Sequence, residues 1–590
     1  MQTLNNVHEQ FADFFTGKHF KPFAFLLSKK LSEGNICLDL KELIGVPGFR
    51  RTYQQLSEIE EDLAQEPFVS CSPENTQPFV LFNSQLYLHR YFSYESMTLG
   101  KIREFLSVEQ ENYSQRVQLI QEHRGFIDSL FPKEELPASL PEAEQVNWQK
   151  LAVLLAVLNN FMIITGGPGT GKTFTVSRIL ELLKRMNPEI KIGLAAPTGK
   201  AAMRLAETLE GDLKPGTIHR LLKTVYGTHR FKHNHDHPLD YDVIIIDEAS
   251  MIDVALFAKL LDAIRRDTRL ILLGDKDQLA SVEAGSMFRD LCQATEGTNS
   301  VSHKTADLLS SFMDRKEAEL FQAYAVGGKS HVLNDHIIEL KRSRRFNSQL
   351  GIGKFSKAVI TSDRGSLESY LRADGKRSDG DSQVKVDIEY SDATFRRGVA
   401  RYADYIQEDD IRLALKKFDQ FRILCAVREG EYGLYQCNSR TEDILKEMKL
   451  IEPTSEFYHN RPVMLTRNNY DLGLYNGDIG LIRADSEGQM MLWFLNGSEL
   501  KAVSPSRIEY LETVFAMTIH KSQGSEYDAV MVMLPRNEET ELLTRELLYT
   551  AVTRAKSSVM IQAAKGALLA STEKSVTRAS GIHERLHSLS

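Results

Sequence analysis

Short apolar runs and longer amphipathic stretches alternate along the middle of the chain. Ile192 to Ala196, Val243 to Ile246 and Leu270 to Leu273 are apolar runs of strand length, and helical patterns separate them. Alternation of this kind predicts a mostly parallel sheet covered by helices. A second pattern of the same type resumes near Ile337 and continues to about Ala564. The chain is therefore expected to be an α/β protein with two sheets.

The regions beside the first pattern are different. Residues before about Pro137 carry mostly amphipathic helical stretches, such as Val7 to Phe15, and a proline-punctuated linker follows them. Residues 294–334 lose the periodic pattern, which is typical of a variable connection. These changes predict three domains: a helical N-terminal domain at residues 1–136, a first α/β domain at residues 137–334 and a second at residues 335–590.

The second α/β region contains an insertion of different character. Short β-rich runs, among them Ile479 to Arg483 and Met490 to Leu495, are separated by turn signals, and Asn496-Gly497 is a strong hairpin signal. This predicts a small β-barrel at about residues 460–511. An ordinary antiparallel extension at the edge of the second sheet is the alternative.

Composition limits the class of protein and the compartment. The chain has 590 residues and a formal net charge of −8, which argues against binding nucleic acid through bulk positive charge. Any groove for nucleic acid must then be a local arrangement of basic and polar groups. The five cysteines form no Cys-x-x-Cys motif, which is typical of free thiols in a reducing compartment. Without a secretory signal or an apolar run of membrane-spanning length, a cytoplasmic location with no membrane contact is expected.

One glycine-rich loop carries the clearest chemical signal. It lies between an apolar run that predicts a strand, Phe161 to Ile164, and a helical stretch from Phe174 to Arg185, the context that a phosphate-binding loop requires. Glycines let backbone N–H groups turn inward on phosphate oxygens, and the helix N-terminus adds partial positive charge. Lys172 is expected to reach the β- and γ-phosphates, and the Thr173 hydroxyl to bind Mg²⁺. The loop residues are Gly166, Gly167, Pro168, Gly169, Thr170, Gly171, Lys172 and Thr173.

Polar residues follow two of the predicted strands. Asp247 and Glu248 end the run from Val243, which places both carboxylates at the C-terminal edge of the sheet beside the phosphate loop. Asp247 is expected to hold Mg²⁺, directly or through water, and Glu248 to polarise an attacking water. Gln278 follows the strand that ends at Leu273, where it suits a sensor of the γ-phosphate. A polar turn without that role is the alternative for Gln278.

Further segments extend this set in a fixed order along the chain. They are Gln149, Ala195 to Ala202, Thr217 to Arg220, Asp247 to Ser250, Gly274 to Gln278, Met517 to Glu526 and Tyr549 to Ala555. Together with the phosphate loop, they resemble the RecD family of superfamily-1 helicases, the alpha subunits of bacterial RecBCD exonuclease V complexes. The resemblance covers about residues 147–556 and implies two RecA-like motor domains with a small SH3-like β-barrel insertion.

The resemblance implies roles at the nucleotide. Gln149 would read adenine, so ATP with Mg²⁺ is the implied cofactor, and Gly166 through Phe174 would contact it. Arg345 and Arg554 would approach the γ-phosphate from the second α/β domain, since the fixed charge and forked donors of arginine suit a transferring phosphoryl group. The family usually has an aromatic residue at the position of Arg344. Which of Arg344 and Arg345 points inward is therefore open, with Arg345 favoured, and a solvated or DNA-facing basic patch is the alternative.

The resemblance also implies a track for single-stranded DNA and movement along it in the 5′→3′ direction. Hydroxyl, imidazole and amide groups suit phosphate and sugar contacts, which position a strand without reading its sequence. For Thr198 and Thr518, helix capping is the alternative. The implied DNA-contacting residues are Thr198, His219, Thr518, His520, Ser522 and Gln523.

One histidine-rich segment has several interpretations. The family places a small β-hairpin at about residues 223–240, where Tyr226 and Phe231 would suit stacking at a DNA fork. His233, His235 and His237 would share one face of a strand, so a metal site is an alternative. A solvated connection is the third interpretation.

The implied partners are single-stranded DNA, duplex DNA ends, and RecB-like and RecC-like subunits of a heterotrimer, with the N-terminal domain as the docking surface. No segment has a convincing nuclease site, so exonuclease activity is expected in another subunit. A stand-alone RecD-like helicase is the alternative; those relatives carry helix-hairpin-helix repeats before the motor, and none is evident before Asn147. A vestigial nucleotide site is disfavoured because Lys172, Asp247, Glu248 and Arg554 are all present.

Overall fold

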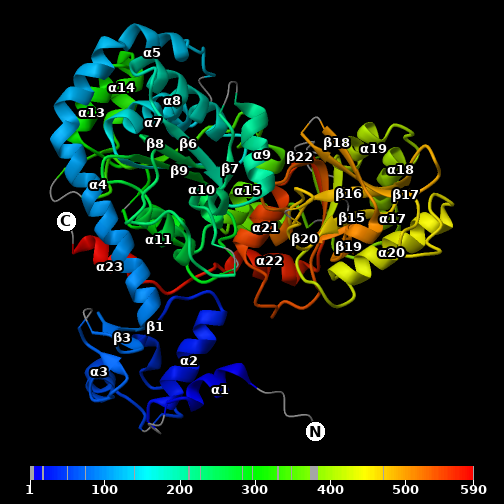
Figure 1. Cartoon of the computed structure of the whole chain (residues 1–590), viewed down its shortest axis with the longest axis horizontal. Coiled ribbons are helices and arrows are strands. Elements are labelled where there is room, and N and C mark those ends of the chain that lie inside the picture. Colours follow the sequence, from blue (N-terminus) through cyan, green and yellow to red (C-terminus); the bar gives the residue numbers. More distant parts are fainter. Residues whose placement is uncertain are drawn as a thin grey trace.

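The computed structural model shows two α/β bodies side by side and a smaller N-terminal domain below the first of them (Figure 1). We call the α/β bodies the first and second lobes. The structure describes residues 6–588 apart from residues 16–18, 50, 73–74, 138–139, 210–212, 226, 282, 296, 328–330, 347, 372–382, 470 and 498.

The first lobe is built on the strands β5 (Phe161–Thr165), β6 (Ile192–Ala196), β7 (Gly216–Thr217), β8 (Val243–Ile246), β9 (Arg269–Gly274) and β12 (Ile337–Glu339). Their order in the sheet is β12-β5-β9-β8-β6-β7. Each neighbouring pair is parallel, as the alternating apolar pattern predicts.

Helices cover both faces of this sheet. Met162 and Ile164 of β5 join one core with α7 (Trp148–Leu158) and α8 (Lys172–Met186). Phe161 and Ile163 point to the opposite face and join a core with α4 (His89–Glu122) and α11 (Val254–Asp262). Burial on two faces explains why the strands are almost continuously apolar.

Residues 294–334, expected to be an unpatterned connection, contain regular elements within their described part. Leu309 and Phe321 pack these elements on the core beneath α7. The expectation was wrong because elements of two to eight residues are too short to show a period. The elements are β10 (Val301–Ser302), α13 (His303–Ser310), α14 (Arg315–Gln322) and β11 (Ala325–Val326), and the lobe also holds α5 (Arg124–Leu130), α6 (Glu142–Gln145), α9 (Gly199–Thr208), α10 (Ile218–Leu222) and α12 (Met287–Gln293).

The predicted domain boundaries at residues 136 and 334 are wrong. β12 pairs with β5 in the first sheet, with Ile337 opposite Ile163, so the first lobe extends past residue 334. α4 begins in the N-terminal domain but packs along α7 and α11. α23 (Ile582–His587) returns from the second lobe to pack on α4 and α12. Periodicity shows that a segment is a helix or a strand, but not which body it joins.

The second lobe is built on the strands β13 (Val384–Asp387), β14 (Phe421–Cys425), β20 (Ala516–Thr518), β21 (Tyr527–Met533) and β22 (Ala555–Gln562). Their order is β13-β22-β21-β14-β20, and each neighbouring pair is parallel. The prediction of an α/β protein with two parallel sheets is confirmed. The helices of this lobe include α15 (Gly351–Ile360), α16 (Arg364–Glu368), α17 (Asp392–Val399), α18 (Ala403–Ile406), α19 (Ile411–Phe418), α20 (Leu434–Glu447), α21 (Arg545–Val552) and α22 (Lys565–Glu573).

The inserted β-rich segment forms a sheet of its own. Its strands are β15 (Pro462–Leu465), β16 (Ile479–Ala484), β17 (Met490–Asn496), β18 (Glu499–Val503) and β19 (Leu511–Thr513). They pair antiparallel in the order β18-β17-β16-β15-β19 around a separate small core. The segment is therefore not an edge extension of the parallel sheet, and the SH3-like barrel stays a prediction.

The N-terminal domain contains the expected helices and also a sheet that the expectation of a helical domain did not include. Its elements are α1 (Val7–Asp13), α2 (Lys21–Ser32), β1 (Cys37–Asp39), α3 (Leu56–Ala64), β2 (Val69–Ser70), β3 (Phe79–Phe82) and β4 (Gln85–Leu88). The strand order is β1-β4-β3-β2. Phe20, Phe23 and Phe79 lie in its core. Strands of two to four residues give no readable alternation in the sequence.

Candidate active site

The phosphate-loop sequence connects the end of β5 to the first turn of α8. Gly169 and Gly171 have φ angles of 77° and 87°, a left-handed conformation that favours glycine. Close packing requires glycine too: a Cβ atom at Gly171 would lie 2.2 Å from Nε2 of Gln149, and one at Gly169 would lie 2.3 Å from Cβ of Arg345. The structure thus places Gln149 and Arg345 directly against the loop.

Lys172 lies beside the carboxylates that follow β8 and β9. Its Nζ atom donates a hydrogen bond to the backbone oxygen of Gly166 over 2.6 Å. Desolvation raises the pKa of Asp247 to about 6, the charge of Glu248 adds to this rise, and the charge of Lys172 opposes it. Desolvation also raises the pKa of the buried Asp275 to about 6, again against the charge of Lys172. The ammonium group therefore acts on two carboxylates from different strands.

Thr173 and Asp247 are the residues that would hold Mg²⁺. Thr173 is in the first turn of α8, and Asp247 is a desolvated carboxylate with a raised pKa, which nearby positive charge would relieve. Carboxylate and hydroxyl oxygens are ligands that Mg²⁺ accepts, so these residues fit the ion. Glu248, next along the chain, has a φ of 52°, and its backbone N–H donates to Oδ1 of Asp247 over 2.9 Å. A positive φ at a glutamate is uncommon and concentrates at functional sites.

A cavity of about 760 Å³ opens beside the phosphate loop. Gln149, Thr170, Phe174 and Arg344 are among the residues that line it. Nε2 of Gln149 donates to the backbone oxygen of Thr170 over 2.8 Å. The Arg344 guanidinium lies 5.8 Å from the centre of the Phe174 ring and pairs with Glu134. This cavity has the position and size for a nucleoside, with Gln149 at its edge.

Arg345 lies at the interface between the two lobes, which we call the seam. It follows β12 of the first sheet, so the expectation that it belongs to the second α/β domain was wrong. Its guanidinium pairs with Glu526 of the second lobe at 2.7 Å, and Arg204 of α9 pairs with the same carboxylate. Burial alone would raise the pKa of Glu526, but Arg204 and Arg345 hold it down at about 2. Arg344 and Arg345 therefore point to different places, and only Arg345 faces the seam.

Arg554 lies at the seam, on the side of the second lobe. Its side chain is 3% exposed; Nε donates to the backbone oxygen of Thr550 and Nη1 to that of Ser525, each over 3.2 Å. Burial lowers the pKa of Arg554, and the charges of Glu248 and Asp275 raise it. The charge of Asp275 is the smallest of these effects on Arg554, and the charge of Lys172 acts on Asp275. Lys172 and Arg554 therefore belong to opposite lobes, and Tyr549, on the helix that precedes Arg554, crosses between the lobes to reach Asp275.

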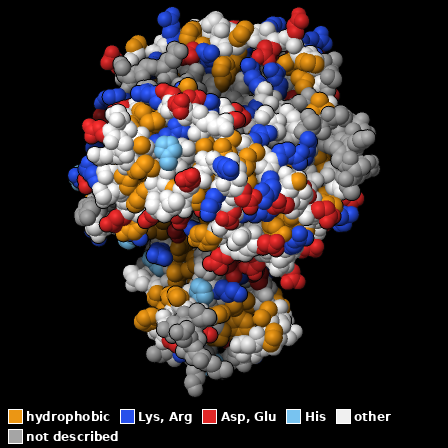
Figure 2. Space-filling view, turned by 90° about the vertical axis from the view of Figure 1, so that its right-hand side faces the viewer, with side chains coloured by type: hydrophobic (Ala, Val, Ile, Leu, Met, Phe, Trp, Pro, Cys, Tyr) orange, Lys and Arg blue, Asp and Glu red, His pale blue; other side chains and the backbone are white. Residues whose placement is uncertain are grey.

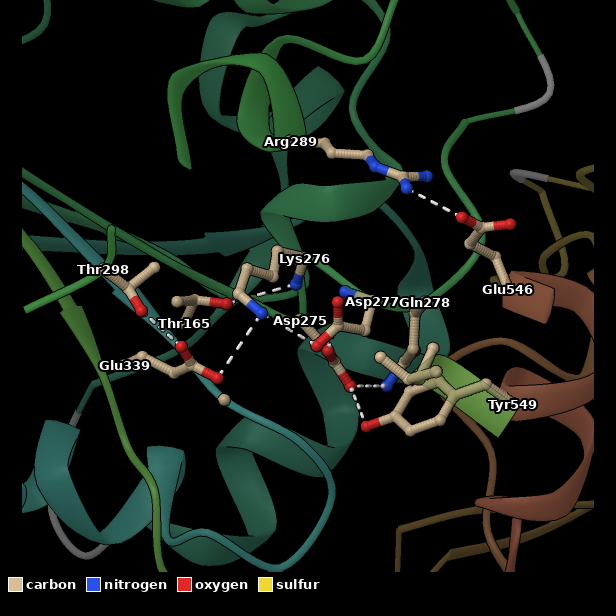
Figure 3. Close-up of polar contacts among 12 residues, drawn as sticks. Thr165, Asp275, Lys276, Asp277, Gln278, Arg289, Thr298, Glu339, Glu546 and Tyr549 are labelled. Atoms are coloured by element: carbon tan, nitrogen blue, oxygen red, sulfur yellow. Dashed lines mark hydrogen bonds and ion pairs between the residues drawn. The ribbon is translucent and has the colours of Figure 1, made fainter. Parts of the chain in front are cut away.

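Figure 3 shows the polar network around Asp275. Nε2 of Gln278 donates to Oδ2 of Asp275 over 2.9 Å, and the hydroxyl of Tyr549 donates to the same oxygen over 3.1 Å. Arg289 of α12 pairs with Glu546 of α21 at 2.7 Å, a second bond across the seam. The sequence pattern includes Tyr549 in a motif without giving it a role, and it carries no signal for the pair formed by Arg289 and Glu546.

The implied DNA-contacting residues are divided by the structure into two groups. Thr198 caps α9, since its Oγ1 accepts from the Ala201 N–H over 3.2 Å, as the capping alternative predicts. A Cβ atom at Gly524 would lie 4.0 Å from Thr198 Oγ1, so the segments from both lobes meet here. Oγ1 of Thr518 accepts from the Lys521 N–H over 3.4 Å, again as the capping alternative predicts.

The other group differs from the expected open track. Ser522 is fully buried, and its hydroxyl donates to the backbone oxygen of Ile519. Gln523 is buried too, and Nε2 donates across the seam to the backbone oxygen of Leu279 over 2.8 Å. Burial lowers the pKa of His520. In this conformation Gln523 bonds across the seam, Ser522 bonds within the second lobe, and neither is exposed to a strand.

The histidine-rich segment forms no strand within its described part. Thr224 and Phe231 make a single antiparallel bridge, and Tyr226 lies outside the described residues. His219 is exposed and contacts the Phe231 ring edge-on at 5.6 Å between centroids. Among the residues that the structure describes, no group of three or more His, Cys, Asp or Glu side chains could hold a metal ion. The shared strand face expected for His233, His235 and His237 is therefore absent from this part of the chain.

The described helices include none that is both long and apolar enough to cross a membrane.

Three family models match separate parts of the chain. An AAA domain matches residues 149–284, a UvrD-like helicase C-terminal domain matches residues 513–561, and the N-terminal domain of RecBCD enzyme subunit RecD matches residues 2–87. The first two matches contain the phosphate loop and Arg554, one in each lobe.

Curated relatives extend this similarity over most of the chain. RecBCD enzyme subunit RecD of Mycobacterium tuberculosis (strain CDC 1551 / Oshkosh) is 35% identical over 77% of this chain and 76% of its own length. The subunit of the same name from Haemophilus influenzae is 31% identical over 96% of this chain and 93% of its own length. The ATP-dependent RecD2 DNA helicase of Deinococcus radiodurans is 27% identical over 68% of this chain and 46% of its own length.

Proposed function

The chain belongs to the family of RecBCD enzyme subunit RecD, and from this membership we propose a specific activity for it. It is an ATP-dependent DNA helicase that moves 5′→3′ as one subunit of a RecBCD helicase-nuclease. It acts in double-strand-break repair, homologous recombination and degradation of linear DNA. The nuclease activity resides in another subunit, and the five free cysteines suit work in the cytoplasm.

One observation carries this proposal: the phosphate loop that ends in Lys172 and the helix that precedes Arg554 meet across the seam, where Tyr549 lies against Gly167 and donates to Asp275. Lys172 binds the β- and γ-phosphates of ATP, and Arg554 stabilises the charge that spreads over the transferred phosphoryl group. Glu248 orients the attacking water and accepts its proton. Mg²⁺ held by Thr173 and Asp247 would neutralise charge on the phosphate oxygens. Hydrolysis then requires the two lobes to be together.

The seam also connects this site to the segment implied to touch DNA. The Leu279 N–H donates to Oγ1 of Thr550 over 3.0 Å, and Gln523 donates to the backbone oxygen of the same leucine. Leu279 directly follows Gln278, so a change at the nucleotide reaches Gln523 through one of these hydrogen bonds and Thr550 through the other. Opening and closing of the seam during ATP turnover would alternate the grip on single-stranded DNA and produce directional movement.

The N-terminal domain is the proposed docking surface for RecB-like and RecC-like subunits. Figure 2 shows hydrophobic side chains gathered on this domain, below the α/β bodies. Val7 and Phe14 of its first helix region are 69% and 80% exposed, and Ile44 is 43% exposed. Apolar side chains that gather into one exposed patch are typical of protein contacts, which supports a docking role for this domain. The match of residues 2–87 to the RecD N-terminal domain favours this assembly over a stand-alone helicase.

The alternative is a RecD-like helicase that works alone, as the similarity to the RecD2 helicase suggests. The mass of the native particle in extract separates the two, because a heterotrimer is much heavier than the 66.9 kDa chain. Migration of the native protein as a monomer would favour the alternative.

A strand-displacement assay tests the activity itself. Duplexes with a 5′ tail or a 3′ tail are incubated with ATP and the purified chain, with and without partner subunits. We expect unwinding of the 5′-tailed duplex only. Lys172→Gln is expected to abolish ATP hydrolysis and unwinding with an unchanged circular dichroism spectrum, whereas Lys184→Gln, an exposed change on the same helix, leaves both activities intact. Turnover at the wild-type rate by Lys172→Gln would refute the site.

A further inference from the structure

Helix α21 presents several polar side chains to the first lobe. Glu546 pairs with Arg289, and Oγ1 of Thr550 accepts from the Leu279 N–H. Between them, Tyr549 points at the first sheet and reaches Asp275, as Figure 3 shows. The helix therefore contacts the first lobe over at least one full turn, with Tyr549 at the centre of that contact.

The hydroxyl of Tyr549 also lies against the phosphate loop. A Cβ atom built on Gly167 would be 2.8 Å from this hydroxyl oxygen. Among the described residues other than its two chain neighbours, it would meet no other atom within 4 Å. Tyr549 is buried, and its hydroxyl donates to Oδ2 of Asp275 over 3.1 Å. One phenol thus touches the loop that cradles phosphate and the carboxylate that follows β9.

Asp275 connects Tyr549 to Gln278 through hydrogen bonds. Oδ2 of Asp275 accepts from both Tyr549 and Nε2 of Gln278, while Oδ1 accepts from the Asp277 N–H over 3.1 Å. Donation by Nε2 fixes the side-chain amide of Gln278, so its Oε1 oxygen is the end directed away from Asp275. An amide fixed in this way presents an acceptor in one direction.

The same helix sets the place of Arg554. Nε of Arg554 donates to the backbone oxygen of Thr550, the residue next to Tyr549. A movement of α21 relative to the phosphate loop therefore moves Tyr549 and Arg554 together. Tyr549 and Arg554 therefore belong to one rigid unit. Within it, Tyr549 contacts the phosphate loop and Arg554 lies at the seam.

We propose that Tyr549 is a positioning residue for ATP hydrolysis: its hydroxyl holds α21 at the spacing from the phosphate loop at which Arg554 and Gln278 are aligned with the γ-phosphate. This inference rests on the proposed ATPase function. The phenol is bonded to Asp275, so we assign it an action through Asp275 and the helix. Its loss then reduces the rate of the chemical step and leaves ATP binding unchanged, because Lys172 and Gln149 remain in place.

Tyr549→Phe tests this role because it removes only the hydroxyl. We expect kcat of DNA-stimulated ATP hydrolysis to fall about tenfold, the effect of one hydrogen bond to a charged group, with KM for ATP within about twofold of the wild type. Tyr405→Phe is the matched control: its buried hydroxyl donates to the backbone oxygen of Asn460 over 2.8 Å inside the second lobe. We expect Tyr405→Phe and Tyr549→Phe to lower the melting temperature by similar amounts. Tyr405→Phe is expected to leave kcat unchanged.

These measurements distinguish failure of the positioning role from failure of the proposed ATPase function. A wild-type chain without DNA-stimulated ATPase activity would refute the function. An active wild type with equal kcat in Tyr549→Phe would overturn the positioning role alone. Equal losses of kcat in Tyr549→Phe and Tyr405→Phe would also overturn it, because they would show a general effect on the fold.

A second variant tests the contact with the loop. Gly167→Ala places a methyl group against the Tyr549 hydroxyl, so it is expected to lower the melting temperature of the protein. In the described part of the chain, apart from the neighbours of Gly167, the hydroxyl oxygen is the one atom that the methyl meets within 4 Å. The double variant Gly167→Ala with Tyr549→Phe is therefore expected to recover most of this loss. A double variant no more stable than Gly167→Ala would contradict the geometry.

Discussion

Replacement of Arg554 by alanine tests most directly whether both lobes contribute to ATP hydrolysis. The arginine is buried at the seam, where it makes hydrogen bonds to the backbone oxygens of Thr550 and Ser525 and faces the charges of Glu248 and Asp275. In the proposed function, ATP binding depends on Lys172 and Gln149, which belong to the first lobe. We therefore expect Arg554→Ala to bind ATP with an affinity within a few fold of the wild type and to lose hydrolysis.

The expected size of the loss follows from the kind of contact. An arginine that stabilises a transferring phosphoryl group is worth about 10³-fold or more in kcat, which corresponds to about 4 kcal/mol of barrier at about 1.4 kcal/mol per factor of ten. The two hydrogen bonds to backbone oxygens contribute about 1.5–3 kcal/mol each to stability, because the donor is charged. Arg554→Ala should therefore lower both kcat and the melting temperature.

The assay must separate these two effects. ATP hydrolysis is measured with saturating single-stranded DNA, and the folded fraction is followed by circular dichroism. Arg422→Ala is the control, since Arg422 is buried in the same lobe and donates to the backbone oxygen of Val514 over 2.7 Å. It should reduce stability but not kcat of the folded fraction. A folded Arg554→Ala variant with more than about a tenth of wild-type kcat would refute the reasoning, because that residual rate leaves less than about 1.4 kcal/mol for the contact.

Two further predictions concern stability. The side chains of Glu546 and Arg289 are 1% and 11% exposed, so Glu546→Ala leaves the buried charge of Arg289 without its ion-pair partner. We expect this variant to lower the free energy of unfolding, measured with denaturant, by about 3–5 kcal/mol. A decrease below about 1 kcal/mol would contradict the prediction. The buried His336 pairs with Glu109 at 2.7 Å; burial opposes ionisation, but Glu109 raises the pKa of His336 above its usual 6.5. The pair therefore stabilises the fold fully below about pH 6.5 and loses its contribution as the pH rises through the folded-state pKa, so the melting-temperature difference between the wild type and His336→Gln should be larger near pH 6 than near pH 8.5. A difference that is the same at both pH values would refute this assignment.

The chemistry of the phosphate loop was predictable because it is local. Lys172 and Thr173 lie in one strand–loop–helix unit, and Asp247 directly follows an apolar strand. Parallel strands bring their carboxyl ends to one edge of the sheet, so these residues were expected to meet before any contact was known. The structure places Lys172 beside Asp247, although their roles with ATP and Mg²⁺ stay predictions.

Several expectations failed where the signal was short or long-range. The N-terminal sheet has strands of two to four residues, too short for a visible alternation. Arg345 was expected in the second α/β domain because the apolar pattern resumes near Ile337, yet that strand closes the edge of the first sheet. The resemblance implied that Ser522 and Gln523 contact DNA, but both side chains are buried, and burial is not visible in composition.

The sequence by itself determined the class of fold, the phosphate loop and the strand-end carboxylates, because each of these depends on neighbours within a few residues. Only the tertiary structure decided which residues face each other across the seam. Tyr549 and Asp275 are 274 positions apart, and Glu546 and Arg289 are 257 apart. Contacts at such separations leave no periodic pattern along the chain, since they form only when two separately folded sheets are packed together.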